Sequence, residues 1–401
     1  MSTSILYHAF GIKGIHYEST SYEGDAIVIR AWLTDQHVKC PECGCRQTTF
    51  KGHKRRKILM SPMGRKRCYL DLLFHRLRCR ECRKLWWPSP GFLDGKHRYT
   101  RSFALTVLDL LAFGTISSVA QYLKVGWDLI KEIHKYKLSR TYRNIPLDEI
   151  NFVGIDEFSI KKGHEYMTIF TDLGTGRIIH AVEGKAKADI YPFLKKLSKR
   201  AKNLKAMAMD MSGSYYNAVR EVLPQVDIVF DHYHVSALVN QAIDELRREQ
   251  QAELDKLGKE TLKGNRYLLL KNYDSLSVDR KERLHNLLSA NDPLFTAHCM
   301  KEQLRLFWEE PDSESARHFL ETWCKDAQQS GIKALAKVGK TLSGYRTGLL
   351  NYFKHHISNA KTEGINNKIK TLKRQAYGFR DMEYFILRLY HLHTQRYSLT
   401  G

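Results

Sequence analysis

The sequence predicts an α/β protein whose mixed-sheet core follows a cysteine-rich basic module and a helical segment. Three observations predict this. Two Cys-x-x-Cys pairs lie within residues 1–95, and helix-forming stretches follow up to residue 148. From residue 151, three strand-like stretches come in a row, and helix, strand, helix and strand then alternate. Consecutive strands followed by such an alternation favour a mixed sheet.

The length and net charge of the chain limit its possible domain organisation and partners. A chain of 401 residues exceeds a single core, so several domains are expected. The net charge of +22 predicts a polyanionic partner, nucleic acid first and an anionic membrane surface second. The longest apolar run, residues 104–114, is too short for a bilayer and contains Asp109. With no signal-peptide pattern, we expect a cytoplasmic, nucleoid-associated protein without membrane contact, whose eight cysteines form no disulfides.

Residues 1–95 are expected to form a zinc-ribbon DNA-binding domain, beginning with strands over residues 5–33. In each of the segments CPEC and CREC, two residues separate the cysteines, so a tight turn can aim both thiolates at one tetrahedral ion. The 35 residues between the pairs leave room for ribbon strands. Cys45 could substitute for Cys43, His53 is a weaker alternate ligand, and Cys68 is spare. The predicted Zn²⁺ ligands are Cys40, Cys43, Cys79 and Cys82.

Basic residues crowd this module in the segments GHKRRK and GRKRC. A solvated charged face would explain them, but beside zinc knuckles they favour phosphate contacts. The residues expected to bind DNA here are Arg55, Arg56, Lys57, Arg65, Lys66 and Arg67.

Residues 96–148 are expected to form a helix-turn-helix domain. Ser117 or Ser118 can cap a first helix, and Val125-Gly126 makes a turn. The second helix carries Lys131 and Lys135, and in this motif the second helix enters the major groove of DNA. An ordinary helical hairpin would show a similar pattern.

Two aspartates are expected at strand ends in the following core. Strands are expected over 151–158, 166–173, 176–184, 204–210 and 226–231, so that Asp156 ends the first strand and Asp210 the fourth. If these two strands are adjacent and parallel, both carboxylates leave the same end and repel, which raises one pKa. Mg²⁺ relieves that conflict, and two such ions can clamp the oxygens of a phosphodiester. Capping of turns is the alternative for each aspartate.

A third acidic group is expected on a helix near the C-terminus. Ile365, Ile369, Leu372 and Ala376 share one face of this helix, whereas Glu363, Asn367, Lys370 and Arg374 share the other. Glu363 is thus the candidate metal ligand, and Lys370 and Arg374 are candidates for the DNA backbone. Rival carboxylates in the preceding helical stretch are Glu309, Glu310, Glu314 and Glu321.

Asp231 and His234 form one more constellation at the end of the fifth strand, which is expected beside the first. His234 could orient a carboxylate or protonate a leaving group. A structural histidine at a strand end is the alternative.

In order and spacing, these motifs resemble bacterial insertion-sequence transposases of the zinc-ribbon DDE type, the insertion-sequence L-three family. The resemblance covers nearly the whole chain and is carried by CPECG, RCRECR, the helix-turn-helix, VGIDEFSIKKGHEY, AMDMSGSYYNAV, DHYHV and NAKTEGINNKIKTLKRQAYGFR. It implies an RNase H-like catalytic core with a DDE triad at Asp156, Asp210 and Glu363, which binds Mg²⁺ or Mn²⁺. It places a D-x-x-H element at Asp231 and His234.

The same resemblance implies an all-α insertion. The core would comprise residues 149–238 and the C-terminal helices of residues 346–401, with the insertion at 239–345. The implied activity is binding of double-stranded terminal inverted repeats, hydrolysis that frees a 3′-OH, and strand transfer to target DNA by a homodimer or higher assembly. Two alternatives stay open, a DNA-binding regulator with an inactive nuclease core and a junction-resolving nuclease on the same fold.

Overall fold

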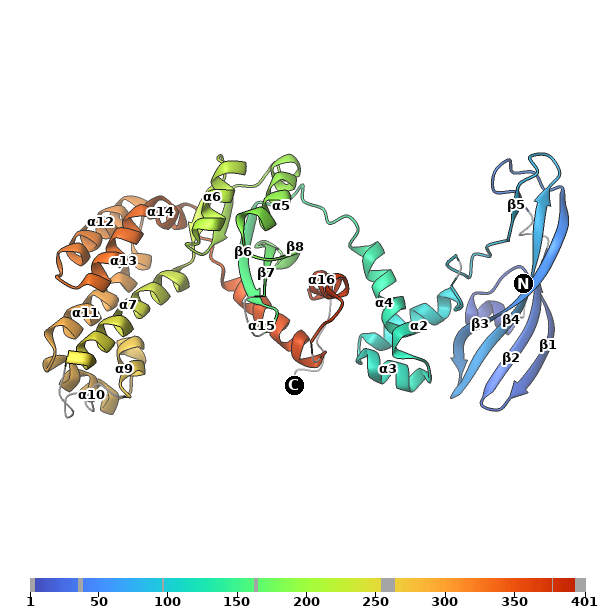
Figure 1. Ribbon diagram of the computed structural model, residues 1–401, viewed down its shortest axis with the longest axis horizontal. Helices are drawn as coiled ribbons and strands as arrows, with labels where there is room; N and C mark the ends of the chain where they lie inside the picture. Colours follow the sequence, from blue (N-terminus) through green and yellow to red (C-terminus); the bar gives the residue numbers. More distant parts are fainter. Residues whose placement is uncertain are drawn as a thin grey trace. The chain divides into compact units, whose positions relative to one another are not determined.

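The computed structural model describes residues 4–34, 39–95, 97–161, 165–253, 264–376 and 378–393, without the side chains of residues 253, 360, 361 and 363. The chain divides into two units between Arg143 and Asn144 (Figure 1). Each unit contains a five-stranded sheet with both parallel and antiparallel neighbours. The predicted α/β class with mixed sheets is therefore confirmed. Within the described residues, no helix is both long and apolar enough to cross a membrane.

The sheet of the first unit has the order β1-β2-β4-β3, with β5 paired to β4. Its strands are β1 (Ile15–Glu23), β2 (Ala26–Leu33), β3 (Thr48–Met63), β4 (Lys66–Cys79) and β5 (Leu85–Trp86). Leu70 and Leu72 of β4 are fully buried, and Leu6 and Phe10 pack into the same core. The expectation of a strand from residue 5 is wrong, because residues Ile5–Phe10 form helix α1. Leu6 and Phe10 lie four residues apart, so a helix turns both onto the sheet.

Three helices of the first unit share a core with β3: α2 (Arg101–Leu111), α3 (Ile116–Leu123) and α4 (Trp127–Thr141). Leu59 of β3 lies in one buried cluster with residues of all three helices. Thr115, not Ser117 or Ser118, caps α3, since its Oγ1 accepts the Ser118 N–H at 3.2 Å. Cap residues sit just outside the first helical turn, and α3 already begins at Ile116, before either expected cap. The strands and the three helices thus form one packed body.

The sheet of the second unit has the order β10-β9-β6-β7-β8. Its strands are β6 (Phe152–Ser159), β7 (Tyr166–Asp172), β8 (Arg177–Glu183), β9 (Ala206–Met209) and β10 (Asp227–Phe230). The first and fourth strands, β6 and β9, are adjacent and parallel, as predicted. The fifth strand, β10, does not lie beside β6, which corrects the prediction. Both edges of β6 are occupied, by β7 and β9, so β10 pairs with β9 instead.

Helices cover both faces of this sheet. Helices α5 (Lys187–Arg200) and α6 (Gly213–Val222) pack on one face, where Val153 and Ile155 of β6 join Phe193 of α5 in the core. On the other side, α15 (Ala360–Gln375) contacts β6 and α16 (Met382–His391) contacts β8. Figure 1 shows α15 passing along β6.

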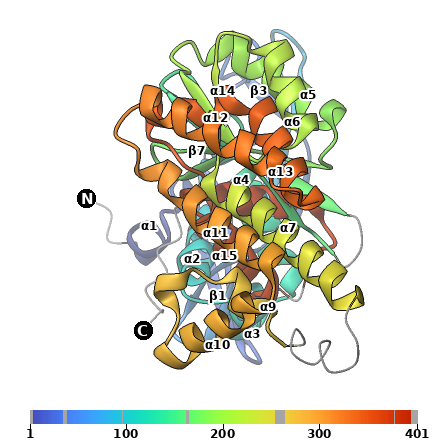
Figure 2. The same ribbon diagram turned by 90° about the vertical axis from the view of Figure 1, so that its left-hand side faces the viewer.

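A helical region lies between β10 and α15 in the chain. It comprises α7 (His232–Glu253), α9 (Arg266–Leu270), η2 (Tyr273–Ser275), α10 (Val278–Ser289), α11 (Asp292–Leu306), η3 (Phe307–Glu309), α12 (Ser313–Gln329), α13 (Lys333–Gly344) and α14 (Arg346–His355). Helix α7 starts directly after β10, runs without a break past residue 239, and packs against α11 and α13 (Figure 2). Helix α14 returns to the sheet, where the Asn351 amide donates to the Ile228 carbonyl at 2.8 Å. These contacts position the helical region on the β10 side of the sheet.

Candidate active site and metal centre

Asp156 and Asp210 lie at the same level on two neighbouring parallel stretches of the chain. The last residue pair of β6 and β9 is Gly154 opposite Ala208. Asp156 lies two residues after Gly154, and Asp210 lies two residues after Ala208. Side chains alternate along a strand, so both carboxylates lie on the face of Gly154 and Ala208. Asp210 follows β9, as predicted, but Asp156 lies inside β6 rather than at its end. The reason is that residues 157–159 continue to pair with β7 after β9 has stopped.

Burial raises the pKa of both aspartates and is the largest cause in each case. Repulsion from Asp210 adds to the shift at Asp156, so the predicted like-charge effect is present but secondary. Each carboxylate nevertheless accepts hydrogen bonds. The Glu157 N–H and the Asn366 amide donate to the two oxygens of Asp156, each at 2.8 Å, and the Ser212 N–H donates to Asp210 at 3.2 Å. Two half-buried carboxyl groups of raised pKa form a pair that a cation would favour in ionised form.

Asp231 and His234 follow β10, which is the strand beside β9 and lies two strands away from β6. Asp231 follows β10 directly and is buried. Burial raises the pKa of Asp231, but contacts with His232, 3.2 Å away, and the Tyr233 N–H outweigh it and hold the pKa below its usual value. His234 lowers the pKa of both Asp156 and Asp210 electrostatically. The histidine is therefore close enough to both carboxylates to act on them electrostatically.

Helix α15 is fastened along β6 by three polar side chains spaced seven residues apart. Asn359 donates to the Ile155 carbonyl at 3.0 Å, Asn366 to the Asp156 carboxylate at 2.8 Å, and Lys373 to the Ser159 carbonyl at 2.6 Å. Seven residues make about two helical turns, so the three contacts lie in one line along the helix. Glu363 lies in α15, but its side chain is outside the described part of the structure.

The predicted apolar stripe of α15 is mostly present. Ile365, Ile369 and Leu372 are buried, as expected. Ala376 is not part of the stripe, because the helix ends at Gln375 and Ala376 is its exposed C-cap. The stripe therefore secures the first four turns of the helix, where the polar contacts with β6 also lie.

Gly154→Ala is expected to lower the free energy of unfolding by about 1–3 kcal/mol, the usual cost of overpacking. A Cβ at this position would lie 2.6 Å from Asn359 Oδ1 and 2.8 Å from Thr362 Oγ1. Both partners are buried and hydrogen-bonded to each other, so they cannot move aside freely. Urea unfolding measures the change. Gly364→Ala in α15 is the control, since its Cβ meets nothing within 4 Å; equal stability of the two variants would contradict this close packing.

Glu157 belongs to a second polar group on the opposite face of β6. Its carboxylate accepts the Tyr215 hydroxyl at 2.9 Å and lies 3.3 Å from the Lys185 ammonium. The Tyr215 hydroxyl also lies 2.9 Å from Thr168 Oγ1. Glu157 is thus held away from Asp156, although its charge still raises the pKa of Asp210. Adjacent positions on a strand point to opposite faces, and this explains why a buried-looking strand carries two carboxylates in succession.

Sequence reasoning missed Asn359, Asn366 and Lys373. The available signal was their spacing of seven in NAKTEGINNKIKTLK, which is two turns of one helix face. The spacing alone does not indicate that this line of side chains faces β6.

Four cysteine thiols gather at one end of the first sheet. The Sγ atoms of Cys40, Cys43, Cys79 and Cys82 all lie within 4.8 Å of one another. Cys45 and His53 are not in this group. The Cys82 N–H and the neighbouring thiols outweigh burial and lower the pKa of Cys79 to about 7. A hydrogen bond from the Lys84 N–H favours the Cys82 thiolate, but burial and the adjacent sulfurs raise the pKa of Cys82 to about 12. Four such thiolates can coexist only around a cation.

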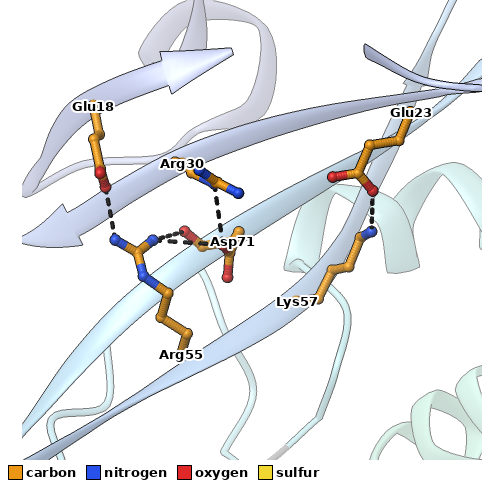
Figure 3. A network of polar contacts seen from close by, with 6 residues as sticks. All are labelled: Glu18, Glu23, Arg30, Arg55, Lys57 and Asp71. Atoms are coloured by element: carbon orange, nitrogen blue, oxygen red, sulfur yellow. Dashed lines mark hydrogen bonds and ion pairs between the residues drawn. The ribbon is translucent and has the colours of Figure 1, made fainter. Parts of the chain in front are cut away.

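The basic residues of β3 are largely committed to partners within the protein (Figure 3). Arg55 lies 2.7 Å from Glu18 and 3.5 Å from Asp71, and Lys57 lies 2.9 Å from Glu23. These acidic groups lie on β1 and β4, so the ion pairs tie strands of one sheet together. Arg56 is half-buried over the Phe74 ring and donates to the His97 carbonyl at 3.0 Å.

The other predicted DNA contacts differ in exposure. Arg65 and Lys66 are exposed where β3 turns into β4, whereas the Arg67 side chain is half-buried. In α4, Lys131 lies 5.9 Å from the centre of the Trp127 ring, and Lys131 and Lys135 are both half-buried. Lys370 and Arg374 are exposed on α15 and form no ion pair with any described residue.

Comparison with known proteins gives consistent matches. The family model for DDE transposases of the insertion-sequence L-three type, described as Transposase, matches residues 153–389. The transposase for insertion sequence element IS1001 of Bordetella parapertussis is 30% identical over 96% of this chain and 95% of its own length. The transposase for insertion sequence element IS1557 of Mycobacterium tuberculosis is 26% identical over 72% of this chain and 70% of its own. The Drosophila P element transposase strand transfer complex matches 74% of this chain and 92% of its own at 10% identity; its TM-score of 0.40 is too low to carry an argument.

Proposed function

The chain belongs to the insertion-sequence L-three family of DDE transposases, and from that premise we propose that Asp156, Asp210 and Glu363 are its catalytic triad. It is a transposase, an enzyme that cleaves DNA strands and transfers them. The observation that carries the assignment is the position of Asp156 and Asp210 on one face of adjacent parallel strands, with the helix of Glu363 fastened along β6.

The residues of this site fit Mg²⁺ or Mn²⁺. The donors are carboxylate oxygens, which these ions prefer, and the buried Asn366 Oδ1 beside them has no hydrogen-bond partner among the described residues. When bound, such ions activate the attacking water or 3′-OH and stabilise the charge on the phosphate. Asp156 and Asp210 are held in place by donors from the backbone and from Asn366. His234, near both, orients a carboxylate or gives a proton to the leaving 3′ oxygen, while Asp231 stays ionised beside it.

We propose an RNase H-like core for this unit. Support comes from three consecutive strands, β6, β7 and β8, that pair antiparallel to one another. Beside β6 lie two parallel strands, β9 and β10, which the chain reaches through helices α5 and α6. The proposed parts of the chain are 1–95, 96–148, 149–238, 239–345 and 346–401. The first two share a core through Leu59, and α7 spans the division at 238 and 239, so neither division is a loose linker.

The N-terminal unit is proposed to recognise the double-stranded terminal inverted repeats. One Zn²⁺ held by the four-cysteine group would fix the tip of the ribbon. Helix α4 would enter the major groove, because α3, the turn at Lys124–Gly126 and α4 follow the helix-turn-helix order. The exposed Arg65, Lys66, Lys370 and Arg374 remain the stronger phosphate-binding candidates, whereas Arg55, Arg56 and Lys57 would have to give up contacts within the protein.

Two repeat ends must be held together for transposition, so we propose that a homodimer or larger assembly forms on the DNA. We propose that this assembly acts at the nucleoid, because the repeat ends that it would cleave and the target DNA both lie there.

Purified full-length protein is expected to nick a duplex carrying the terminal repeat in the presence of Mg²⁺ and to leave a 3′-OH at the element end. Chelation of Mg²⁺ should remove the activity, and a duplex of the same composition in scrambled order should remain largely uncut. Mapping of the cut by primer extension and ligation of the new end check the prediction. Preference for a four-way junction over the repeat end would instead indicate a junction nuclease.

A further inference from the structure

Asn366, in the second unit, has a hydrogen-bond partner at only one end of its side-chain amide among the described residues. Its Nδ2 donates to the Asp156 carboxylate at 2.8 Å. Its Oδ1 is buried and has no hydrogen-bond partner among the described residues. A buried carbonyl oxygen without a partner is unfavourable and uncommon in proteins. The neighbouring Asn359 shows the normal case, since its Nδ2 donates to Ile155 and its Oδ1 accepts from Thr362.

The position of Asn366 is fixed by its helix. One helical line places Asn359 and Lys373 on either side of it, each bonded to a backbone carbonyl of β6. Ile365 and Ile369 are buried on the same helix, and Gly154 allows the helix to approach β6 closely. Asn366 is half-buried as a residue, but its Oδ1 is buried, so this oxygen is placed to accept a group that enters the site.

We propose that Asn366 serves the catalytic metal site as a fourth side chain, with its N–H fixing Asp156 and its Oδ1 supplying a neutral oxygen donor to the cation shell. The inference rests on the proposed assignment of Asp156 and Asp210 as metal ligands. An amide oxygen is a donor that Mg²⁺ and Mn²⁺ accept, and it adds no negative charge to a half-buried site that already holds two carboxylates of raised pKa. This explains an asparagine at a position where a further carboxylate would increase repulsion.

Mn²⁺ binding to the full-length, zinc-loaded protein without DNA tests the proposal, because the electron paramagnetic resonance signal of free Mn²⁺ reports occupancy independently of activity. Asn366→Leu keeps the approximate volume but removes both amide ends, and we expect its Kd for Mn²⁺ to rise about 10–100-fold, the usual range for residues that support a metal site. Asn366→Asp keeps an oxygen donor but loses the N–H that holds Asp156 and adds a negative charge, so its Kd should rise less than that of Asn366→Leu. Asn367→Leu, at the exposed neighbouring asparagine, is the matched control and should bind normally.

The outcomes separate this inference from the proposed function. Asp156→Asn should abolish Mn²⁺ binding; if it does not, the assignment of the metal site itself fails. If Asp156→Asn loses binding while a folded Asn366→Leu binds within twofold of the unaltered protein, only the role of Asn366 fails. Equal weakening by Asn366→Leu and Asn366→Asp would also overturn it, because the oxygen donor would then contribute nothing. The thermal midpoint of each variant shows whether it is folded.

Discussion

Glu363→Gln is expected to bind the repeat end with nearly unaltered affinity and to lose Mg²⁺-dependent nicking by at least about a hundredfold. Glutamine keeps the volume of the side chain but removes its charge, and even outer-shell partners of a metal cost 10–100-fold when replaced. Affinity is retained because binding depends mainly on phosphate contacts made elsewhere on the protein. A gel-shift assay and a nicking assay on the same duplex measure the two properties.

The rival glutamates provide matched controls. Glu321 lies on α12, is exposed, and pairs with Arg346 at 3.8 Å, an arrangement that contributes little to stability. Glu309 ends the short helix η3 in the same helical region. Glu321→Gln and Glu309→Gln should therefore nick normally. Near-normal nicking by Glu363→Gln would contradict the proposal that Glu363 is the third catalytic carboxylate. Loss of nicking by a folded Glu321→Gln would instead assign that role to Glu321 in the helical region.

The position of Asp156 and Asp210 at the same edge of the sheet could be predicted from the sequence, because the pattern that indicates it is local. A short apolar strand that ends in a carboxylate, repeated at two strands of an alternating pattern, indicates the same edge of a sheet whatever the details of packing. The pairing of β6 with β9 confirms that step. The extension of β6 past Asp156 could not be predicted, since it depends on the length over which β7 remains paired.

Asn366 and the ion pairs of Arg55 and Lys57 could not be predicted, because they depend on tertiary register. Arg55 on β3 meets Glu18 on β1 although β4 and β2 lie between these two strands in the sheet order. A run of basic residues in a sequence indicates exposure and charge but does not identify acidic neighbours several strands away. The place of β10 was missed for a related reason, as strand order beyond the first parallel pair is decided by which edges are still free.

Cys79→Ser is expected to reduce the zinc content from one ion per chain to nearly none and to weaken repeat-end binding at least about tenfold. Structural zinc sites contribute about 10–16 kcal/mol of apparent binding free energy at neutral pH, which is coupled to folding of the surrounding chain. Cys79 ends β4 opposite Thr48 of β3, so its loss releases both knuckles from the ribbon. Metal analysis and titration of a labelled repeat duplex check these two results.

The loss of order should be confined to the knuckle end of the sheet. Ile58, Leu70 and Leu72 form an apolar core with α1 that does not include the cysteine ligands, and Leu59 ties β3 to the three helices. Hydrogen exchange should therefore quicken at residues 39–49 and 78–87 while the middle of β4 stays protected. Cys45→Ser is the control, because Cys45 lies outside the four-thiol group and its thiol hydrogen-bonds to the backbone of Gln47. Full zinc occupancy after Cys79→Ser would contradict the ligand set, and uniform exchange along β4 would show that the ribbon cannot fold without its metal.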